Sequence, residues 1–291
     1  PVDSEDSYWY RRTPKKPTAP FKLTDHYSHK GVQGKVAVAG AAPGTVGAGL
    51  FCAQAAQNVG SGLVSILAPK DSIPILQAKA PEIMSFGFDR IFDADTLVLG
   101  PGCSKDSLIQ KQLKQLMKQH KKSVIVDAEG LRMFQNWHEL VEILQPHPEQ
   151  RQCILTPHPG ELKALVKLFQ DSKSGNFEDM TQELNQIGIT LLAKDAYTIL
   201  HSPDCKPLVL GEPNVQLARG GSGDILAGVI ASFLAKDLKA IDAICLAFDW
   251  INYAAKPANL INVQSELTEG SPVSLLLTSL NRLRLELTKT S

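Results

Sequence analysis

Short apolar segments alternate with longer amphipathic or small-residue segments along most of the chain. The first apolar segment, 35–39, precedes a glycine-containing turn at 40–44, an alanine-rich segment at 47–59 and a second apolar segment at 63–68. A short apolar run bounded by turn residues predicts a buried strand, and a longer periodic segment predicts a helix. Two strands joined by a turn and a helix form a βαβ unit, whose strands pair in parallel.

The same alternation continues to the C-terminus. We expect further strands at 96–99, 123–127 and 153–156 and further helices at 106–120, 160–169, about 180–187, 222–235, 240–255 and about 272–287. The segments 189–193, 197–201, 207–210 and 215–218 predict four strands too close together for crossover helices, so they should form an antiparallel edge. The predicted fold class is α/β, a three-layer sandwich with a mixed sheet.

Residues 1–33 differ from the rest of the chain because they are polar and rich in proline, with an aromatic and basic patch at 8–12. We expect an N-terminal extension that packs on its own domain or on a neighbouring subunit. A single domain over 34–291 should follow it.

Charge and cysteine content narrow the classes of function. Thirty basic and thirty acidic residues give a formal net charge of zero, so we expect no nucleic-acid partner. The apolar runs end well before membrane-spanning length, so we expect no membrane partner. The five cysteines lie far apart without a CxxC pair, which favours a reducing compartment and a cytoplasmic location. Because the sequence starts at Pro1, an organelle location after removal of a targeting segment also stays open.

The segment Gly220-Gly221-Ser222-Gly223-Asp224 carries the strongest chemical signal, because an apolar helix begins directly after it. A glycine-rich helix N-terminus offers backbone N–H groups and a partial positive charge to an anion such as phosphate. Asp224 fits such a site if a proton must be removed beside that phosphate. The alternative is a plain helix cap made by the side chain of Ser222 or Asp224.

The segment Thr156-Pro157-His158-Pro159-Gly160-Glu161 follows a predicted strand and opens a helix, where ligands bind in open α/β sheets. His158 is either an imidazole near the substrate or a cap of a rigid turn. Glu161 either complements the helix dipole or reaches a metal-bound water. A similar segment at 145–149 has no clear strand before it, and we discount its His147.

Two further turns are candidates. Lys194 lies in a tight connection between predicted strands and either contacts phosphate or is an ordinary solvated lysine. Gly100-Pro101-Gly102 ends a buried strand and is either a ligand-binding turn or a plain turn. Asp127 also ends a strand and is either structural or near the site.

Taken in order, these motifs resemble those of the NAD(P)H-hydrate dehydratase family, the ribokinase-like repair enzymes, from about residue 29 to 255. The family's motifs correspond to Lys30-Gly31-Val32-Gln33-Gly34, Gly60–Val64, Gly100–Gly102, Thr156–Glu161 and Gly220–Asp224. The resemblance implies a ribokinase-like three-layer α/β/α sandwich with a mostly parallel mixed sheet and an antiparallel edge.

The resemblance also implies a reaction. ADP or ATP phosphorylates the added hydroxyl of NADHX or NADPHX, the hydrated forms of NADH and NADPH, and phosphate then leaves. Asp224 would be the general base, Mg²⁺ would accompany the nucleotide, and the protein would be a homo-oligomer. The implied substrate contacts are Ala48, Gly102, His158 and Asp224, and the implied nucleotide contacts are Lys194, Asp195, Ala196, Tyr197, Thr198, Gly221, Ser222 and Gly223.

The chain departs from the family pattern at four places. Asp195 stands where the family usually has glycine, Ser222 replaces threonine, 40–45 replaces a first turn with Gly-Gly-Ser and a tyrosine, and 249–255 replaces a His-Gly-x-Ala-Gly segment. An acidic side chain beside phosphate is unfavourable unless it points away. Two alternatives therefore stay open: a small-molecule kinase of the same fold, and a member that binds nucleotide without catalysis.

Overall fold

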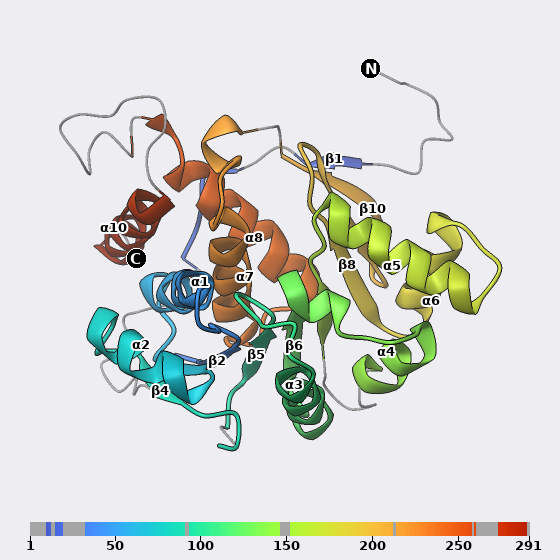
Figure 1. Cartoon of the computed structure of the whole chain (residues 1–291). Coiled ribbons are helices and arrows are strands. Elements are labelled where there is room, and N and C mark those ends of the chain that lie inside the picture. The colour runs from blue at the N-terminus through green and yellow to red at the C-terminus, as the bar shows by residue number, and fades with distance from the viewer. Residues whose placement is uncertain are drawn as a thin grey trace.

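The computed structural model describes residues 10–12, 15–19, 33–90, 93–145, 152–211, 214–257, 259 and 273–289. Residues 30–32 of the first family motif and His147 lie outside the described residues. Within them, one ten-stranded sheet has the order β1-β10-β9-β8-β7-β6-β5-β2-β3-β4, with helices on both faces (Figure 1). The strands are β1 (Tyr10–Arg12), β2 (Lys35–Ala39), β3 (Leu63–Leu67), β4 (Met84–Phe86), β5 (Thr96–Leu99), β6 (Ser123–Val126), β7 (Cys153–Leu155), β8 (Ile189–Ala193), β9 (Thr198–Ser202) and β10 (Cys205–Leu210).

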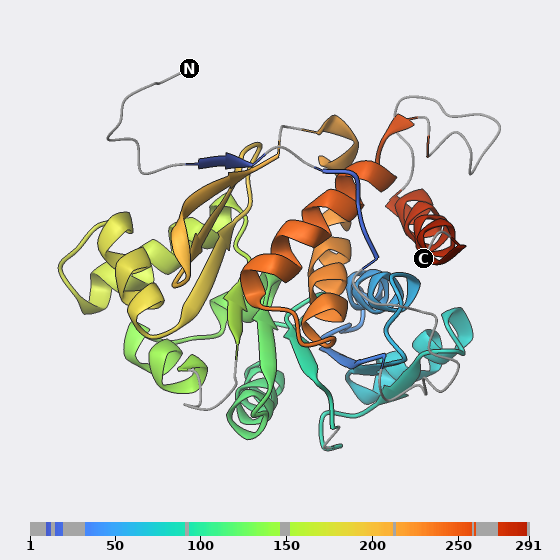
Figure 2. The same ribbon diagram turned by 180° about the vertical axis from the view of Figure 1, so that it is seen from behind.

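Two helical layers cover the sheet, as Figures 1 and 2 show from opposite sides. One layer contains α1 (Val46–Asn58), α2 (Ile73–Lys79), α7 (Ser222–Leu234), α8 (Ala240–Ala254) and α10 (Val273–Lys289). The other contains α3 (Ser107–Gln119), α4 (Trp137–Leu144), α5 (Pro159–Ser172) and α6 (Phe177–Gln186). This arrangement confirms the predicted three-layer α/β sandwich.

Strand directions also agree with the predictions. The seven strands β4, β3, β2, β5, β6, β7 and β8, in the order of the sheet, all run parallel to one another. Strand β9 runs antiparallel to both β8 and β10. The short β1 then pairs parallel with β10 and becomes the outermost strand. The aromatic and basic N-terminal patch therefore contributes a strand to its own sheet.

Successive side chains of the central strands pack alternately into two separate hydrophobic cores, one on each face of the sheet. In β2, Val36 and Val38 pack into one core while Ala37 and Ala39 pack into the other. In β5, Val98 faces the first core and its neighbours face the second. Successive side chains of a strand point to opposite faces, so a strand buried on both faces has a continuous apolar run. This is why the sequence pattern located these strands well.

The prediction of a strand at 215–218 was wrong. Residues Val215–Leu217 form a 3₁₀ turn, η3, in which the Asn214 side chain accepts a hydrogen bond from the backbone N–H of Gln216 at 3.0 Å. Val215 is 79% exposed, so no sheet buries it. A local asparagine turn competes successfully with strand formation here.

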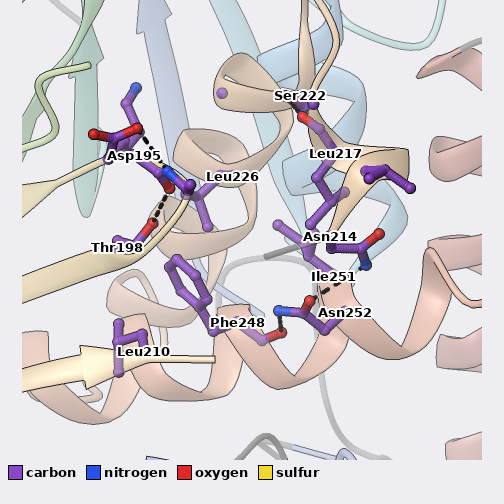
Figure 3. A pocket seen from close by; sticks show the side chains of 15 residues that line it. Asp195, Thr198, Leu210, Asn214, Leu217, Ser222, Leu226, Phe248, Ile251 and Asn252 are labelled. Carbon is purple, nitrogen blue, oxygen red and sulfur yellow. Dashed lines mark hydrogen bonds between the residues drawn. The ribbon is translucent and has the colours of Figure 1, made fainter. Parts of the chain in front are cut away.

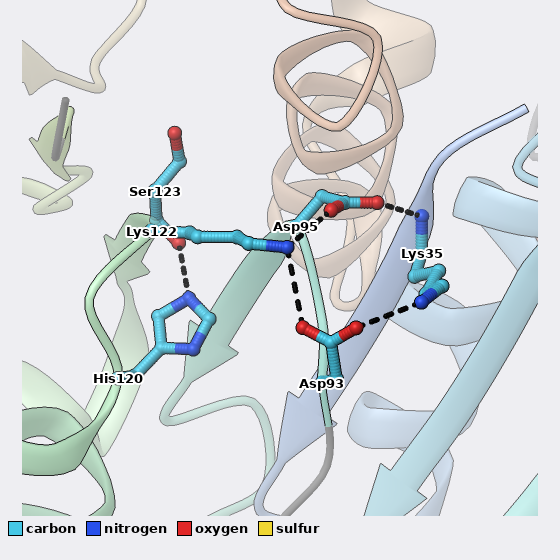
Figure 4. A network of polar contacts seen from close by, with 6 residues as sticks. All are labelled: Lys35, Asp93, Asp95, His120, Lys122 and Ser123. Carbon is cyan, nitrogen blue, oxygen red and sulfur yellow. Dashed lines mark hydrogen bonds and ion pairs between the residues drawn. The ribbon is translucent and has the colours of Figure 1, made fainter. Parts of the chain in front are cut away.

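A polar network ties the amino ends of three strands together at the edge opposite the candidate site (Figure 4). The ammonium of Lys122 contacts the carboxylates of Asp93 at 3.2 Å and Asp95 at 2.8 Å. Lys35 contacts Asp93 through its own ammonium and Asp95 through its backbone N–H. The four side chains are partly exposed, and pairs of this kind contribute little to stability individually. The network fixes the starts of β2, β5 and β6.

Helices α1 and α7 pack unusually closely through small residues. A β-carbon added to Gly228 would come within 2.1 Å of the Cys52 carbonyl oxygen. Further along the same interface, the Ser61 hydroxyl donates to that of Ser232 at 2.8 Å. The α1–α7 contact therefore fixes the position of α7 above the sheet, and with it the glycine-rich helix start.

The N-terminal segment 15–19 is attached to α8. The backbone N–H of Lys15 donates to the Asp249 carboxylate at 2.9 Å, and the Trp250 indole N–H donates to the Thr18 carbonyl at 3.0 Å. Both α8 side chains are almost fully buried. Two residues of segment 249–255, where the chain departs from the family pattern, thus hold the N-terminal segment against α8.

No described helix is both long enough and apolar enough to cross a lipid bilayer.

The α1–α7 contact makes a stability prediction. Gly228→Ala should destabilise the fold by about 1–3 kcal/mol, because the added methyl group meets backbone that cannot move freely. Urea denaturation followed by circular dichroism measures the change. Gly47→Ala in α1 is the control, since an added β-carbon there meets nothing within 4 Å. That control should be neutral or slightly stabilising. Equal stability of Gly228→Ala and wild type would contradict the close packing.

Candidate functional site

The carboxyl ends of five parallel strands meet at one edge of the sheet. Gly40 follows β2, Gly100 follows β5, Asp127 follows β6, Thr156 follows β7 and Lys194 follows β8. Side chains at this edge of an open α/β sheet converge on a shared ligand site. The structure therefore brings together turns that lie far apart in the sequence.

A buried ion pair joins two of these strand ends. The Lys194 ammonium lies 2.6 Å from the Asp127 carboxylate, and the exposed fractions of the two side chains are 17% and 2%. The Lys194 backbone N–H also donates to the Pro157 carbonyl at 2.8 Å. The interpretation of Lys194 as a solvated turn lysine is therefore wrong. Its ammonium also faces α7, because a β-carbon on Gly223 would lie 3.3 Å from it.

No side chain caps the N-terminus of α7. Gly221 is the capping residue, with a φ of 95°. The Ser222 hydroxyl instead donates to the carbonyls of Leu217 and Arg219 at 2.7 and 2.8 Å. The alternative of a plain cap by Ser222 or Asp224 is therefore wrong. A glycine suits this left-handed position, where a β-carbon would also lie 2.9 Å from the Phe51 ring.

Asp224 lies in the first turn of α7 within a group of buried charges. Burial raises the pKa of Asp224 to about 7, and the carboxylates of Asp127 and Glu161 act in the same direction. The nearby Lys194 ammonium lowers the pKa and partly offsets these effects. A carboxyl group with a pKa near neutrality can accept a proton efficiently at physiological pH.

His158 and Glu161 form a reciprocal cap at the start of α5. His158 Nδ1 accepts from the backbone N–H groups of Gly160 and Glu161, while Glu161 Oε2 accepts from the His158 N–H at 3.0 Å. Because Nδ1 is an acceptor, Nε2 carries the proton and faces Glu161 Oε1 at 2.9 Å. The alternative of a capping histidine is confirmed, and the expected contact of His158 with the substrate stays a prediction. Its ring is 54% exposed, so one face stays accessible to a ligand.

Gly102 and Ala48 lie side by side. The Thr45 hydroxyl and the Ala42 N–H both donate to the Gly102 carbonyl, at 2.8 and 2.7 Å. A β-carbon on Gly102 would lie 3.2 Å from the Ala48 methyl group. The turn at 100–102 is therefore locked to the start of α1, and the two residues expected at the substrate form one small surface.

A pocket of about 450 Å³ opens beside the N-terminus of α7 (Figure 3). Its polar end contains six of the residues expected at the nucleotide, and its other walls come from β10, η3, α7 and α8. The predicted residues are Lys194, Asp195, Ala196, Thr198, Ser222 and Gly223, and the others are Leu210, Asn214, Val215, Leu217, Ala218, Leu226, Phe248, Ile251 and Asn252. Gly221 and Tyr197 are not part of this lining, and Tyr197 is 54% exposed.

The Asp195 carboxylate is engaged within its own turn. Asp195 Oδ1 accepts from the backbone N–H of Ala196 at 2.7 Å, and the Thr198 hydroxyl contacts the Asp195 carbonyl at 3.4 Å. The local hydrogen bond holds one carboxylate oxygen in the turn beside the pocket entrance. Asp195 therefore shapes the connection between β8 and β9 as well as lining the pocket.

The charged groups fit a metal ion that arrives with phosphate better than a resident one. Among the described residues, no group of three or more histidine, cysteine, aspartate or glutamate side chains is arranged to hold a metal. Asp127 is paired with Lys194, and both Glu161 oxygens contact His158. Mg²⁺ in nucleotide sites usually keeps several waters and takes few protein ligands besides the phosphates.

Several pocket residues lie outside the predicted site, and Asp127 was predicted as one of two alternatives, either structural or near the site. Its ion pair with Lys194 places Asp127 among the charges of the site. Asn252 lies in the 249–255 segment that departs from the family pattern, but no role in the pocket was predicted for it. Phe248 precedes that segment and Asn214 precedes the predicted strand at 215–218, and no motif in the sequence marks either residue.

The strand order and the two helical layers are those of a ribokinase-like α/β fold. The fold is similar to a ribokinase-like superfamily protein from Enterococcus faecalis, with a TM-score of 0.73, 23% identity and coverage of 98% of this chain and 97% of that one. The chain belongs to the NAD(P)H-hydrate dehydratase family, whose sequence profile matches residues 36–269.

Individual relatives agree with this family. The ADP-dependent (S)-NAD(P)H-hydrate dehydratase of Lactococcus lactis is 31% identical over 219 residues, which cover 72% of this chain and 76% of the relative. The structure of the Bacillus subtilis ADP/ATP-dependent NAD(P)H-hydrate dehydratase, co-crystallised with ATP and Mg²⁺, has a TM-score of 0.68 at 23% identity and covers 92% of this chain and 94% of that one. The chain also matches 42% of a bifunctional NAD(P)H-hydrate repair enzyme from Moorella thermoacetica, at 29% identity over 72% of this chain.

The raised pKa of Asp224 makes a prediction for stability. Between pH 3.8 and about 7 the folded protein retains a proton that the unfolded chain releases, so stability declines as the pH rises through this window. Asp224→Asn removes this loss. At pH 8 the variant should be more stable than wild type by about 2–4 kcal/mol, because one pKa unit corresponds to about 1.4 kcal/mol.

Urea unfolding at pH 5, 6.5 and 8 measures this effect. Asp242→Asn is the matched control, since Asp242 is also in the first turn of a helix but is exposed. The difference in unfolding free energy between Asp242→Asn and wild type should be the same at all three pH values. If Asp224→Asn is less stable than wild type at pH 8, Asp224 is not a destabilising buried carboxylate.

Proposed function

We propose that the protein restores NADH and NADPH from their hydrates, NADHX and NADPHX, in a dehydration that consumes ADP or ATP. The nucleotide phosphorylates the hydroxyl group of the hydrate, and the carbon–oxygen bond then breaks as phosphate leaves. Membership of the NAD(P)H-hydrate dehydratase family supports the substrate class. The structural observation that carries the proposal is a carboxylate, Asp224, in the uncapped first turn of α7 beside the Lys194 ammonium.

Asp224 is the proposed general base. Its carboxylate accepts the hydroxyl proton as the hydroxyl oxygen forms a bond to the transferring phosphorus atom. The pKa of about 7 suits this task, because a base works best when its pKa lies near the working pH. The glycine at 223 lines the pocket and leaves room beside the Lys194 ammonium.

The open helix start stabilises the phosphoryl group. The backbone N–H group of Gly223 and the positive end of α7 would oppose the charge on its oxygens, while the Ser222 N–H donates to the Arg219 carbonyl at 3.3 Å. Lys194, which lines the pocket beside them, supplies a full positive charge. The turn from Asp195 through Thr198 would hold the rest of the nucleotide phosphates. Mg²⁺ would enter with these phosphates and neutralise part of their charge.

The hydrate would lie on the other side of Asp224. Ala48 and Gly102 form one small surface there, and the exposed face of His158 is a second contact. Because Glu161 holds the His158 ring in one tautomer, the imidazole keeps its orientation when substrate enters. Glu161 itself would act through His158 or through a water at the metal.

The proposal also covers the phosphoryl donor, the assembly of the protein and its location. Either ADP or ATP would serve as phosphoryl donor. The protein would assemble as a homo-oligomer. It would work in the cytoplasm, in keeping with five cysteines spaced without a disulfide framework.

The proposal is tested by supplying NADHX, Mg²⁺ and either ADP or ATP and following the return of NADH absorbance at 340 nm. Wild type should restore NADH with at least one nucleotide. Asp224→Asn should lower kcat by about 10²–10⁴-fold, the usual contribution of a general base. Its nucleotide affinity, measured by calorimetry, should stay within a few-fold of wild type.

Asp242→Asn again serves as the control and should retain wild-type turnover. No NADH with either nucleotide would refute the dehydratase activity. Phosphorylation of another small alcohol would then indicate the kinase alternative, and nucleotide binding without any turnover would indicate the binding-only alternative. Wild-type kcat in Asp224→Asn would show that Asp224 is not the base.

A further inference from the structure

Two asparagine side chains stand in an otherwise apolar wall of the nucleotide pocket. Asn214 precedes η3 and Asn252 lies in the last turns of α8, and both line the pocket. Figure 3 shows them on the side formed by η3 and α8, across the pocket from Asp195 and Thr198. Leucine, isoleucine and phenylalanine side chains make up most of the surface around them. Polar groups in such a wall need a partner when a ligand excludes water.

The orientation of both amides is fixed by hydrogen bonds. Asn252 Nδ2 donates to the Phe248 carbonyl at 2.9 Å, so its Oδ1 points the other way. Asn214 Oδ1 accepts from the Gln216 N–H at 3.0 Å, which turns its Nδ2 toward Asn252 Oδ1, 3.4 Å away. An amide that must present nitrogen to a carbonyl cannot rotate by 180° without losing that bond.

The two amides still have unused hydrogen-bonding capacity. Asn252 Oδ1 accepts one hydrogen bond and can accept a second, and each Nδ2 donates one hydrogen bond and can donate a second. An acceptor and donors therefore lie next to each other in the wall. Such a pattern complements a ligand edge that offers a donor beside an acceptor.

The position of the pair relative to the phosphate site identifies the relevant part of the ligand. Lys194 and the start of α7 occupy one end of the pocket, where the phosphates bind in the proposed function. Leu210, Phe248 and Ile251 line a region farther from that end, suited to a flat aromatic ring. The asparagine pair borders this region.

We propose that Asn252, held in orientation by Asn214, selects adenine over guanine in the nucleotide. Asn252 Oδ1 accepts from the exocyclic amino group of adenine, and an amide N–H donates to the neighbouring ring nitrogen. Asparagine matches this edge because adenine presents an amino donor beside a ring acceptor. Guanine presents a carbonyl oxygen in place of the amino group, which would face Asn252 Oδ1. The inference rests on the proposed use of a nucleotide.

The test measures ADP and GDP affinities of the full chain by isothermal titration calorimetry with Mg²⁺ present. Wild type should bind ADP at least about tenfold more tightly than GDP. Asn252→Ala should weaken ADP binding about tenfold, the size expected for losing about one hydrogen bond, and change GDP binding little. The preference for adenine should therefore nearly disappear. Asn214→Ala should reduce the preference less, because Asn252 keeps its bond to Phe248.

Asn58→Ala is the control. Asn58 is also a helical asparagine whose Nδ2 donates to a backbone carbonyl, that of Leu277 at 3.0 Å, but it is not part of the pocket lining. Its ADP-to-GDP ratio should equal that of wild type. Because Asn214 lies outside α8, the Asn214→Ala variant still tests the inference if Asn252→Ala fails to fold.

Two results would overturn the inference alone: equal wild-type affinity for ADP and GDP, or an unchanged ratio in both pocket variants. Failure of wild type to bind either nucleotide would overturn the proposed function together with the inference. The two failures are therefore distinguishable by the wild-type titrations.

Discussion

The site depends on a single buried cation, the ammonium of Lys194. Its ion pair with Asp127 joins the carboxyl ends of β8 and β6, and the Lys194 backbone is tied to the turn that opens α5. The Asp127 carboxylate raises the pKa of both Asp224 and Glu161, although burial has the larger effect on each, and the Lys194 ammonium lowers both pKa values. Removing one partner of a buried pair leaves an uncompensated charge, which costs about 3–5 kcal/mol. Lys194 is thus both a structural link and a positive charge beside the start of α7.

The fold has an unfavourable buried charge and an uncapped helix start at the site and offsets their cost elsewhere. A carboxyl group whose pKa is raised by burial opposes folding at neutral pH, and an uncapped helix start leaves polar groups without a partner from the protein. The dense α1–α7 contact around Gly228 and the two filled cores hold these features in place. Active sites commonly concentrate such costs because the same features serve chemistry.

Much of the fold was predictable because its central strands are buried on both faces and therefore form continuous apolar runs. The chemical motifs were also predictable, since glycines and charged residues at strand ends interrupt those runs. The turn at 215–217 was not, because a side-chain hydrogen bond from Asn214 decided it. The short β1, and the buried contacts of Asp249 and Trp250 with segment 15–19, depend on residues more than 190 positions apart. The pocket walls from Phe248 and Asn252 likewise depend on tertiary packing, which brings α8 against β10 and η3.

The most direct test of the account is the pH dependence of kcat in wild type and in Lys194→Met. The account predicts that wild-type kcat rises about tenfold per pH unit below a midpoint near 7 and is constant above it, because Asp224 must lose its proton to act. In Lys194→Met the remaining activity should show a midpoint at higher pH, since the ammonium that lowers the pKa of Asp224 is gone. A wild-type profile that is flat from pH 5.5 to 8.5, or an unchanged midpoint in the variant, would contradict the account.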